Sequence, residues 1–450
     1  MMMNKILTFG LIIPLLAIYG CKKFLEEKSD QRLSTIETIT DMQALLNFYN
    51  DLNYNEPAMG EICGDNYFIS DAVFNQRPDH ERNLYVWAAA YVFPEASNSW
   101  LYGYKQVNIA NTVLQAVKDK ETSINDKVRL ANIKAQALFF RAKAYFNMVS
   151  IWAMPYDRAS STQLPGLPLR LDPDLNKVST RAGLAETYAQ IIQDFTQCLP
   201  HLLEKDVIQT RPSKGAAYGM LSRVYLQMRE YNQAGKYADS ALNIQRTLID
   251  YNKLDANANF PIALLNAEVI FESRTGHTLI QQASTFVSPE LYNLYSSNDL
   301  RKTIFFRPSG TNYLFRGSYE GAASYFTGIS TGELLLTRAE CLIRSEQINK
   351  GLEDLNQLLI NRLRSGSFVP IKGLNKDEAL KMIKTERRKE LAFRALRWAD
   401  IRRFNQEGDA IILKRNVNGK EYTLMPNDLR YALAIPEDII QLSGISQNAR

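Results

Sequence analysis

Amphipathic segments in adjacent pairs are the feature of this sequence that most constrains its fold. The clearest pair covers residues 213–229 and 231–243. The first segment carries large side chains at helical spacing and the second carries alanines, so the two predicted helices can pack closely, as in a tetratricopeptide hairpin. The positions are Tyr218, Leu221, Ser222, Tyr225, Ala234, Ala238 and Ala241. Generic antiparallel helices share much of this spacing and remain an alternative.

Two further pairs repeat the pattern. One is predicted over about 100–118 and 126–153, before Pro155. A weaker copy is marked by Leu335, Ala339, Leu342, Gly351, Leu355 and Leu358. Each hairpin buries its apolar face only by stacking on a neighbour. The sequence therefore predicts a mostly α fold of tetratricopeptide-like helical hairpins with irregular, loop-rich insertions.

Two irregular regions interrupt this helical pattern. Residues 54–98 are rich in Asn, Asp, Pro and aromatic residues, and Leu84–Trp87 is predicted to form a short strand or an extended arm. Residues 250–330 carry many aromatic, Gly, Ser and Asn residues, and so long an insertion in a helical array is usually functional. We expect an N-terminal part over 35–250, with helical repeats, and a C-terminal part over 251–450, with the insertion and a C-terminal helix.

The first residues have the character of a secretory leader. Residues 6–20 form an apolar run of about fifteen residues, shorter than the roughly 20 that a spanning helix needs. Ile18-Tyr19-Gly20-Cys21 resembles a bacterial lipobox, with Tyr19 as a departure, and the resemblance implies lipidation of Cys21. We therefore expect a signal peptide over 1–20 and a tether over 21–34. An ordinary signal peptide followed by a chance cysteine is the alternative.

Composition argues against several classes of function. The net charge of +5 is mild for 450 residues and no long basic run occurs, so nucleic acid is not an expected partner. The four cysteines are scattered without a CxxC pair, so neither a zinc site nor a disulfide framework is indicated, and Cys198 and Cys341 are expected to be buried thiols. We expect no metal and no cofactor.

Enzymatic motifs are also missing from the sequence. It has three histidines and no HExxH, GxSxG or P-loop motif. A pair of carboxylates would suffice for glycoside hydrolysis, and 48 acidic residues leave that possibility open, although no pair stands out. We expect a protein that is not an enzyme.

The C-terminal third carries the most specific motif. Residues 385–393 read TERRKELAF and residues 397–403 read RWADIRR. They resemble the signature ER..EL..EG.RW.DL.R of the SusD/RagB family, with a departure at Arg394-Ala395, where that family often has Glu-Gly. Further resemblances follow in order along the chain: Asp65-Asn66-Tyr67, the segment 137–146, Arg338-Ala339-Glu340, Ala434-Ile435-Pro436 and Gln447-Asn448.

The signature itself is expected to be structural. If Glu386–Arg403 forms one helix, Glu386 and Glu390 lie near Arg387, Arg394 and Arg397 at i to i+4 spacing. Trp398 is expected in the core. The residues that mark the family would then differ from those that select a ligand.

The resemblance implies a location and a partner. It implies a lipid-anchored protein on the outer leaflet of the cell outer membrane, facing the exterior. It also implies a SusC-type TonB-dependent barrel transporter, over which the protein acts as a hinged lid that traps a nutrient without chemistry on it. An oligosaccharide or polysaccharide is the expected cargo, and peptide cargo of the RagB type or a helical scaffold that binds no ligand are the alternatives.

Ligand contacts are expected in the two irregular regions, about 65–98 and 250–330, which resemble the ligand face of the family. Aromatic rings cover the apolar faces of sugars, and neighbouring polar groups take the hydroxyls. The candidates are Asn66, Tyr67, Arg77, Trp87, Tyr91, Tyr313, Phe315 and Tyr319. Many of the 23 Tyr and 20 Phe residues must fill the core instead, and Trp100 and Trp152 are expected there.

Overall fold

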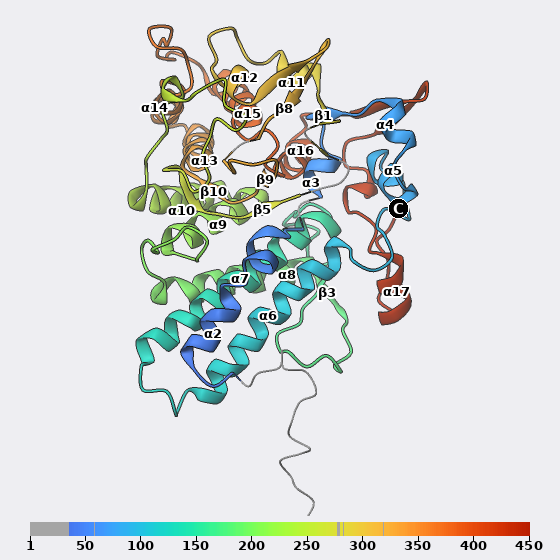
Figure 1. Ribbon diagram of the computed structural model, residues 1–450, viewed down its shortest axis with the longest axis vertical. Coiled ribbons are helices and arrows are strands. Elements are labelled where there is room, and N and C mark those ends of the chain that lie inside the picture. The colour runs from blue at the N-terminus through green and yellow to red at the C-terminus, as the bar shows by residue number, and fades with distance from the viewer. Residues whose placement is uncertain (1–35, 58, 277–279, 282, 318) are drawn as a thin grey trace, which may run out of the picture.

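Stacked helical hairpins form the body of the protein (Figure 1). The computed structural model describes residues 36–57, 59–276, 280–281, 283–317 and 319–450. The hairpins are α6 (Ser99–Lys120) with α7 (Lys127–Trp152), α9 (Lys214–Gln227) with α10 (Tyr231–Ile244), and α13 (Thr331–Arg344) with α14 (Ile348–Leu359). Helix α8 (Leu184–Cys198) contacts both α7 and α9, and α10 packs against α13. The predicted mostly α fold is confirmed.

Local sequence signals set where these helices begin. The side chain of Asn98 accepts a hydrogen bond from the amide of Leu101, and that of Asp126 accepts one from Arg129. Ser213 caps α9 in the same way. Such caps satisfy amides that have no partner within the helix. The short helix α2 (Ile39–Leu46) is capped by Thr38 and packs on α6 and α7.

Small residues let the second and third hairpins approach closely. The alanines predicted for α10, at 234, 238 and 241, are fully buried. A Cβ added at Gly235 would lie only 2.9 Å from the Cβ of Cys341 on α13. A larger residue at 235 would therefore force the hairpins apart.

The insertion is a set of short strands and helices. The strands are β4 (Val269–Phe271), β5 (Arg274–Thr275), β6 (Phe286–Val287), β7 (Phe306–Ser309), β8 (Asn312–Phe315), β9 (Tyr325–Phe326) and β10 (Ile329–Ser330). The helices are α11 (Pro289–Tyr292) and α12 (Arg301–Ile304). An antiparallel sheet in the order β1-β6-β8-β7 joins the insertion to the early strand β1 (Tyr67–Phe68), with Tyr67 opposite Val287. Two regions that are far apart in sequence thus form one unit.

The early region is more helical than predicted. It follows a π-helix (Asn50–Tyr54) and contains α3 (Gly60–Cys63), α4 (Asp71–Asn75) and α5 (Asp79–Tyr85). The expected strand or extended arm over Leu84–Trp87 is wrong. Helix α5 runs to Tyr85, and the chain then turns with Trp87 in the left-handed region (φ 55°).

The expected single helix Glu386–Arg403 is also wrong. Helix α15 (Lys376–Glu390) ends, and α16 (Arg397–Gln406) begins after a turn in which Phe393 and Ala395 have φ values of 60° and 58°. The break buries the ring of Phe393 against Phe315, with centroids 4.3 Å apart. It also lets Arg387 of α15 pair with Asp400 of α16 at 2.8 Å. Burial of an aromatic ring and a closed ion pair thus favour the break over helix continuity.

The remaining elements complete the shell. These are β2 (Pro165–Pro168), β3 (Arg181–Gly183), the hairpin β11 (Leu413–Val417) and β12 (Lys420–Leu424), α17 (Glu437–Ser443), and three 3-10 turns at Leu199–His201, Tyr251–Lys253 and Leu429–Tyr431. Trp100, Trp152 and Trp398 are buried, as expected, and Cys63, Cys198 and Cys341 are buried, unpaired thiols. Within the described ranges, every helix is too short or too polar to cross a membrane.

Candidate ligand-binding groove

A groove opens where the early region, the insertion and the C-terminal segments meet. The cavity measures about 480 Å³ and lies between β1, the start of α11, the last turn of α15 and β11. Its lining comes from residues within 64–87, from 288–290, from Arg388 and from 412–416. We call it the β1–β11 groove. Both regions that the sequence predicts to face a ligand contribute to it.

The floor of the groove is held by Arg415. Its guanidinium carbon lies 3.9 Å from the ring centroid of Tyr85, 4.6 Å from that of Trp87 and 5.0 Å from that of Tyr67. The same guanidinium donates to the carbonyls of Ile62 and Gly64, at 2.7 and 2.8 Å. A planar, permanently charged group can stack on rings and hydrogen-bond at its edge at the same time. The floor is therefore rigid.

Tyr67 and Trp87 are consequently buried. The hydroxyl of Tyr67 donates to the carbonyl of Ile62 at 2.9 Å, and the indole N–H of Trp87 donates to that of Cys63 at 3.0 Å. Their exposed fractions are 3% and 1%. They line the groove from below, and their side chains do not offer the exposed platform that the sequence suggests.

Asp65 carries the negative charge of the floor. Its carboxylate accepts from Arg397 at 2.7 and 2.9 Å and lies 3.2 Å from Arg388. Burial opposes ionisation, but the guanidinium of Arg397, and then that of Arg388, hold the pKa of Asp65 well below its usual range. The carboxylate is thus a fixed, ionised partner of two arginines.

Asn66 lies beneath the groove and ties its parts together. Its amide donates to Glu61 at 3.0 Å and its carbonyl oxygen accepts from Arg388 at 3.3 Å. Glu61 in turn accepts from the backbone of Ala395 at 2.9 Å, and burial raises the pKa of Glu61 to about 7. Asn66 is 1% exposed, and its side chain joins α3 to α15, while Glu61 joins α3 to the α15–α16 turn.

The accessible rim consists of side chains that the sequence reasoning missed. The half-buried ring of Phe68 packs on Phe286, with centroids 5.4 Å apart. Ile412 is 43% exposed, and Glu290, Lys414 and Asn416 are exposed beside it. Burial alternates along 413–417, but the sequence there has polar residues at three consecutive positions, 414–416. No period-two signal in the sequence could therefore have indicated that Lys414 and Asn416 face outward.

Tyr313 lies on the same sheet but outside the groove lining. Its ring stacks on Tyr292 with centroids 3.6 Å apart and an interplanar angle of 15°. The ammonium of Lys302 lies 4.5 Å from the Tyr292 centroid. Both tyrosines are half-buried, so this pair presents aromatic surface on the insertion.

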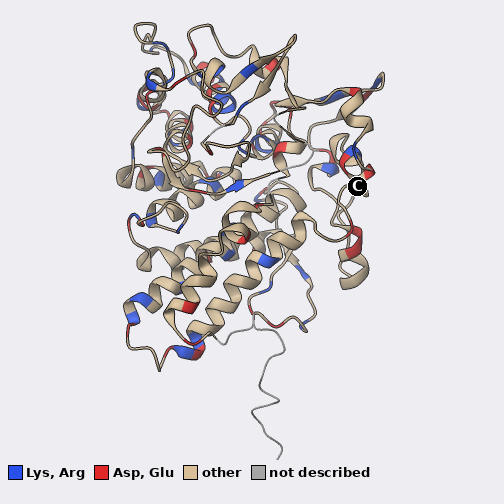
Figure 2. Ribbon diagram, in the orientation of Figure 1, with Lys and Arg blue, Asp and Glu red and all other residues tan. Residues whose placement is uncertain are grey.

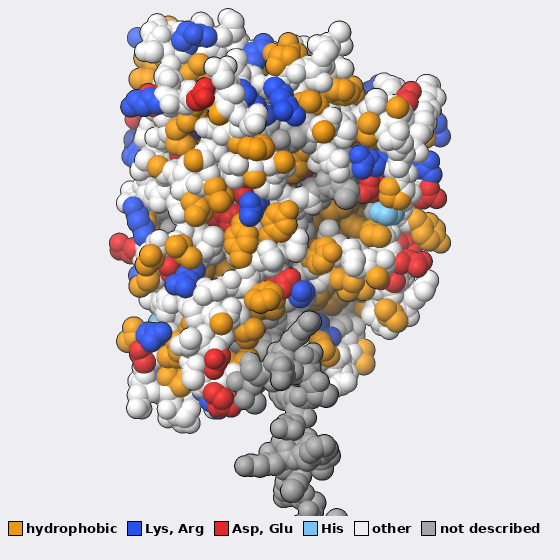
Figure 3. Space-filling model, viewed as in Figure 1, with side chains coloured by type: hydrophobic (Ala, Val, Ile, Leu, Met, Phe, Trp, Pro, Cys, Tyr) orange, Lys and Arg blue, Asp and Glu red, His pale blue; other side chains and the backbone are white. Residues whose placement is uncertain are grey.

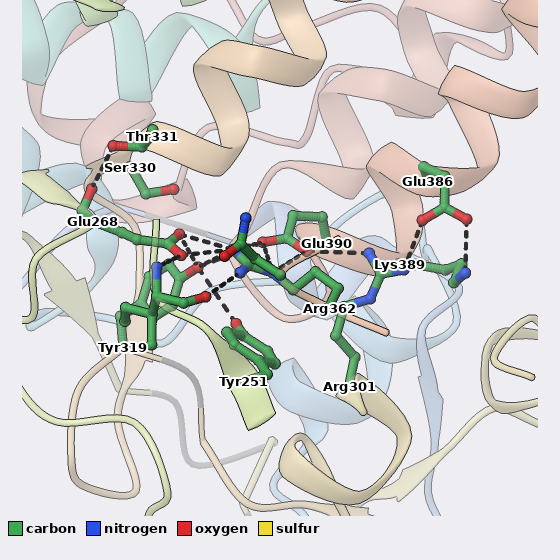
Figure 4. Close-up of polar contacts among 12 residues, drawn as sticks. Tyr251, Glu268, Arg301, Tyr319, Ser330, Thr331, Arg362, Glu386, Lys389 and Glu390 are labelled. Carbon is green, nitrogen blue, oxygen red and sulfur yellow. Dashed lines mark hydrogen bonds and ion pairs between the residues drawn. The ribbon is translucent and has the colours of Figure 1, made fainter. Parts of the chain in front are cut away.

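Phe315 and Tyr319 are core residues instead. Phe315 is 2% exposed and Tyr319 is fully buried. Tyr319 donates to Glu268 at 2.6 Å (Figure 4). The Arg394 guanidinium lies 3.9 Å from the Tyr319 ring centroid. The sequence predicts exposed rings at these two positions, but in the structure both rings pack in the interior.

Tyr319 borders a buried ionic cluster, shown in Figure 4, which consists of Glu268, Asp299, Arg301, Arg362, Glu386, Lys389 and Glu390. The carboxylate of Glu390 forms ion pairs with both Arg301, at 3.1 Å, and Arg362, at 2.9 Å. The partners of Glu386 and Glu390 thus come largely from other segments rather than from the predicted helix-neighbour arginines. The cluster fastens the insertion to α15, which carries Arg388 of the groove.

Arg77 and Tyr91 lie away from the groove lining. Arg77 is half-buried on the segment between α4 and α5 and lies 3.8 Å from Glu81. Tyr91 is 67% exposed, and its amide donates to Glu437 at 2.6 Å. Cys21 lies outside the described residues. Ligand binding by Arg77 and Tyr91 and lipidation of Cys21 stay predictions.

The protein carries charges of both signs. Figure 2 shows Lys and Arg residues scattered along the chain together with Asp and Glu residues, with long uncharged stretches between them. On the face drawn in Figure 3, the two signs are interspersed among separate hydrophobic patches. That face has no continuous basic stripe of the kind that tracks a phosphate backbone.

Two family models match the chain. One, described as "Starch-binding associating with outer membrane", matches residues 23–226, and the other, described as "SusD family", matches residues 287–436. The residues that line the β1–β11 groove all fall within these two ranges.

Relatives of known description agree with these matches. A SusD-like protein of Formosa agariphila is 24% identical, over 87% of this chain and 89% of its own. A SusD-like protein of Bacteroides ovatus is 28% identical over 33% of this chain, and the match spans only 26% of that protein.

Solved structures show the same fold. A SusD superfamily protein from Bacteroides thetaiotaomicron has a TM-score of 0.74 and 20% identity, with 92% of this chain and 100% of that chain covered. A putative sugar binding protein from Bacteroides vulgatus has a TM-score of 0.75 and 21% identity, with 92% and 99% covered. With the two family models spanning most of its length, this chain belongs to the SusD/RagB family.

Proposed function

We propose that the protein is an outer-membrane lipoprotein that binds an oligosaccharide in the β1–β11 groove. The observation that carries this proposal is the rim, where the ring of Phe68 and the aliphatic Ile412 lie beside Lys414, Asn416 and Glu290. The family description supports a starch or sugar ligand, as does the description of the similar Bacteroides vulgatus structure.

The rim has the chemistry that a pyranose needs. The C–H face of a sugar ring can cover Phe68, while the amide of Asn416 and the charges of Lys414 and Glu290 take hydroxyl groups. Because Arg415 fixes the floor, little side-chain freedom has to be lost when a ligand enters. A preformed site of about 480 Å³ accommodates a few sugar units rather than a whole polymer.

The groove favours binding over hydrolysis. The acidic residues in its lining are Asp65 and Glu290. Glycoside hydrolysis needs a protonated carboxyl as general acid beside a second carboxylate. Asp65 is kept ionised by Arg397 and Arg388, so it cannot donate that proton. We therefore propose a non-enzymatic role.

A binding protein at the cell surface needs a membrane anchor and a transporter that takes up its ligand. We propose lipidation of Cys21, attachment to the exterior face of the outer membrane, and delivery to a SusC-type TonB-dependent transporter over which the protein acts as a hinged lid. Two or more acyl chains on one cysteine are enough for stable anchoring. Replacement of Cys21 by Ala should move the protein from the membrane to the soluble fraction, and a variant still held by washed membranes without the transporter would refute the anchor.

The ligand is tested with a matched pair of phenylalanine variants in the Cys21→Ala chain. A glycan array should first identify a bound oligosaccharide, and calorimetry should then give its dissociation constant. We expect Phe68→Ala to raise that constant about tenfold, from the lost stacking and buried area. Phe48→Ala is the control, because Phe48 is 57% exposed next to α2 and outside the groove.

Two outcomes would redirect the proposal. Equal affinities for the Phe68 and Phe48 variants would place the ligand elsewhere. Binding of peptides in place of glycans would favour RagB-type cargo, since peptides are held largely through backbone hydrogen bonds.

A further inference from the structure

The loop between β2 and β3 presents aliphatic side chains to solvent. Leu171, Leu175 and Val178 are 47%, 76% and 88% exposed. Single exposed apolar residues are common on protein surfaces, but three within eight residues form a cluster. Leu442 on α17 is 84% exposed, and α17 lies across a small pocket from the loop.

That pocket joins the loop to the body. It has a volume of about 220 Å³ and is lined by Leu175 of the loop, Trp100 of α6, and Ile439 and Ile445 around α17. We call Leu171, Leu175, Val178 and Leu442 the apolar apron. The apron is therefore continuous with an apolar pocket instead of being an isolated loop tip.

Most polar groups of the loop are paired within it or with α6, and the exposed carboxylate of Asp174 accepts hydrogen bonds from Asn176. Arg170 donates to the carbonyl of Lys177 at 3.2 Å and to the hydroxyl of Ser179 at 2.7 Å. Lys177 pairs with Asp172 at 2.8 Å. The amide of Asn111 on α6 holds the loop by donating to the carbonyls of Arg170 and Asp172, at 3.0 and 3.2 Å. A loop of this kind can approach an apolar phase without stranding many polar groups.

The apron lies near the end of the molecule where the described chain begins. Lys120, at the end of α6, pairs with Glu37, at the start of the described chain. Asn111, which holds the loop, lies about 14 Å from Lys120 along the helix axis at roughly 1.5 Å per residue. Figure 1 shows the loop before β3 at the same lower end of the molecule from which the chain enters α2. The segment that leads back to Cys21 therefore starts on the side of the apron.

We propose that the apolar apron is a membrane-contact surface that inserts into the boundary between headgroups and acyl chains of the lipid leaflet that holds the anchor. This inference rests on the proposed lipidation of Cys21. The apron offers aliphatic side chains and few unpaired polar groups, which suits a non-directional lipid phase better than a specific protein partner. A second contact of this kind would fix the orientation of the body on the membrane.

The test uses two cysteine variants of the full-length, lipidated chain, Val178→Cys and Val369→Cys. Val369 is the matched control, because it is also a valine in an exposed loop, at 76%, but lies in the loop after α14. Each is labelled with an environment-sensitive fluorophore and reconstituted, without the transporter, in vesicles of phosphatidylcholine and phosphatidylglycerol. Quenching by a lipid with a nitroxide on its acyl chain is then measured.

The expected result is strong quenching at 178 and little at 369 in vesicle-bound protein. If the protein floats with the vesicles and both labels stay unquenched, the apron proposal fails while the anchor stands. If the protein does not float, the anchor and the apron both fail. A blue shift at 178 that grows with protein concentration in the absence of vesicles would overturn the proposal in favour of a second copy of the chain.

A second measurement separates the apron from the groove. In the Cys21→Ala chain, Leu175→Ser with Val178→Ser should lower the weak partitioning into vesicles by roughly tenfold or more, since two aliphatic contacts are lost. The affinity for the oligosaccharide should not change. Unchanged partitioning would contradict the apron.

Discussion

Glu390 shows how single residues hold this fold together. Its carboxylate is fully buried and forms ion pairs with Arg301 and Arg362, which come from different segments of the chain. Removing each guanidinium and the carboxylate from water costs free energy. Only their mutual attraction and hydrogen bonds offset that cost and make the arrangement stable. Loss of one charge in such a cluster leaves the others uncompensated.

We therefore expect Glu390→Gln to lower the free energy of unfolding by about 3–5 kcal/mol, measured by denaturant titration. Glu421→Gln is the control, because the pair of Glu421 with Lys414 is exposed, and such pairs contribute little. Similar stabilities for the two variants would show that the buried cluster is not a determinant of stability.

Two buried carboxyls predict how stability depends on pH. Burial opposes their ionisation, but Arg301 lowers the pKa of Asp299 to about 2, and Arg403 lowers that of Glu340 to about 2. Both values lie below those of the unfolded chain, so the stabilisation is complete above about pH 5 and is lost as the pH falls toward 2. Denaturant titrations across this range should show a falling free energy of unfolding. Glu340→Gln should reduce the slope, by up to about 1.4 kcal/mol per pH unit.

At the scale of elements, the hairpins could be predicted from the sequence and the sheet could not. The alanines of α10 and the large residues of α9 repeat at the helical period, which is a local signal. Strand β1 has two residues, Tyr67 and Phe68, and pairs with a strand more than 200 residues later. A two-residue strand has no period to detect, so this pairing depends on long-range packing.

The groove was only partly predictable for the same reason. Trp87 lies in an Asn- and Pro-rich stretch that suggests exposure, yet Arg415, from the other end of the chain, covers its ring. The two regions that the sequence predicts to face a ligand both line the groove, but Phe68, Ile412 and Asn416 at the rim were not foreseen. Which aromatic residues are accessible depends on their partners rather than on their local sequence.

The α15–α16 turn holds Ala395 in a strained backbone conformation. Ala395 has φ 58°, a conformation that costs about 1 kcal/mol for a residue with a Cβ and little for glycine. The glycine usual at this place in the family signature fits that geometry. Ala395→Gly should raise the free energy of unfolding by about 0.5–1 kcal/mol, whereas Ala392→Gly, at a buried position with negative φ, should lower it. Destabilisation by both would refute the strain.

Contacts between the early region and the C-terminal segments close the whole molecule, and Arg415 makes several of them near the groove. It links β11 to the rings of Tyr67, Tyr85 and Trp87 and to backbone carbonyls of the early region. A lysine would keep the charge but lose the planar stacking and most of the donors. Arg415→Lys should therefore loosen the early region without unfolding the hairpins.

Hydrogen exchange can measure this directly. Amides within 60–93 should exchange at least tenfold faster in Arg415→Lys, while those of α6, α7, α9 and α10 should keep their protection, because the hairpins are held by their own packing. Affinity for the oligosaccharide that we propose binds in the groove should fall in parallel, since the floor is no longer preformed. Arg82→Lys is the control on the same region, because its pair with Asp79 is largely exposed. Faster exchange throughout the hairpins would mean that Arg415 supports the whole fold. Unchanged exchange in 60–93 would mean that Arg415 does not stabilise the early region either.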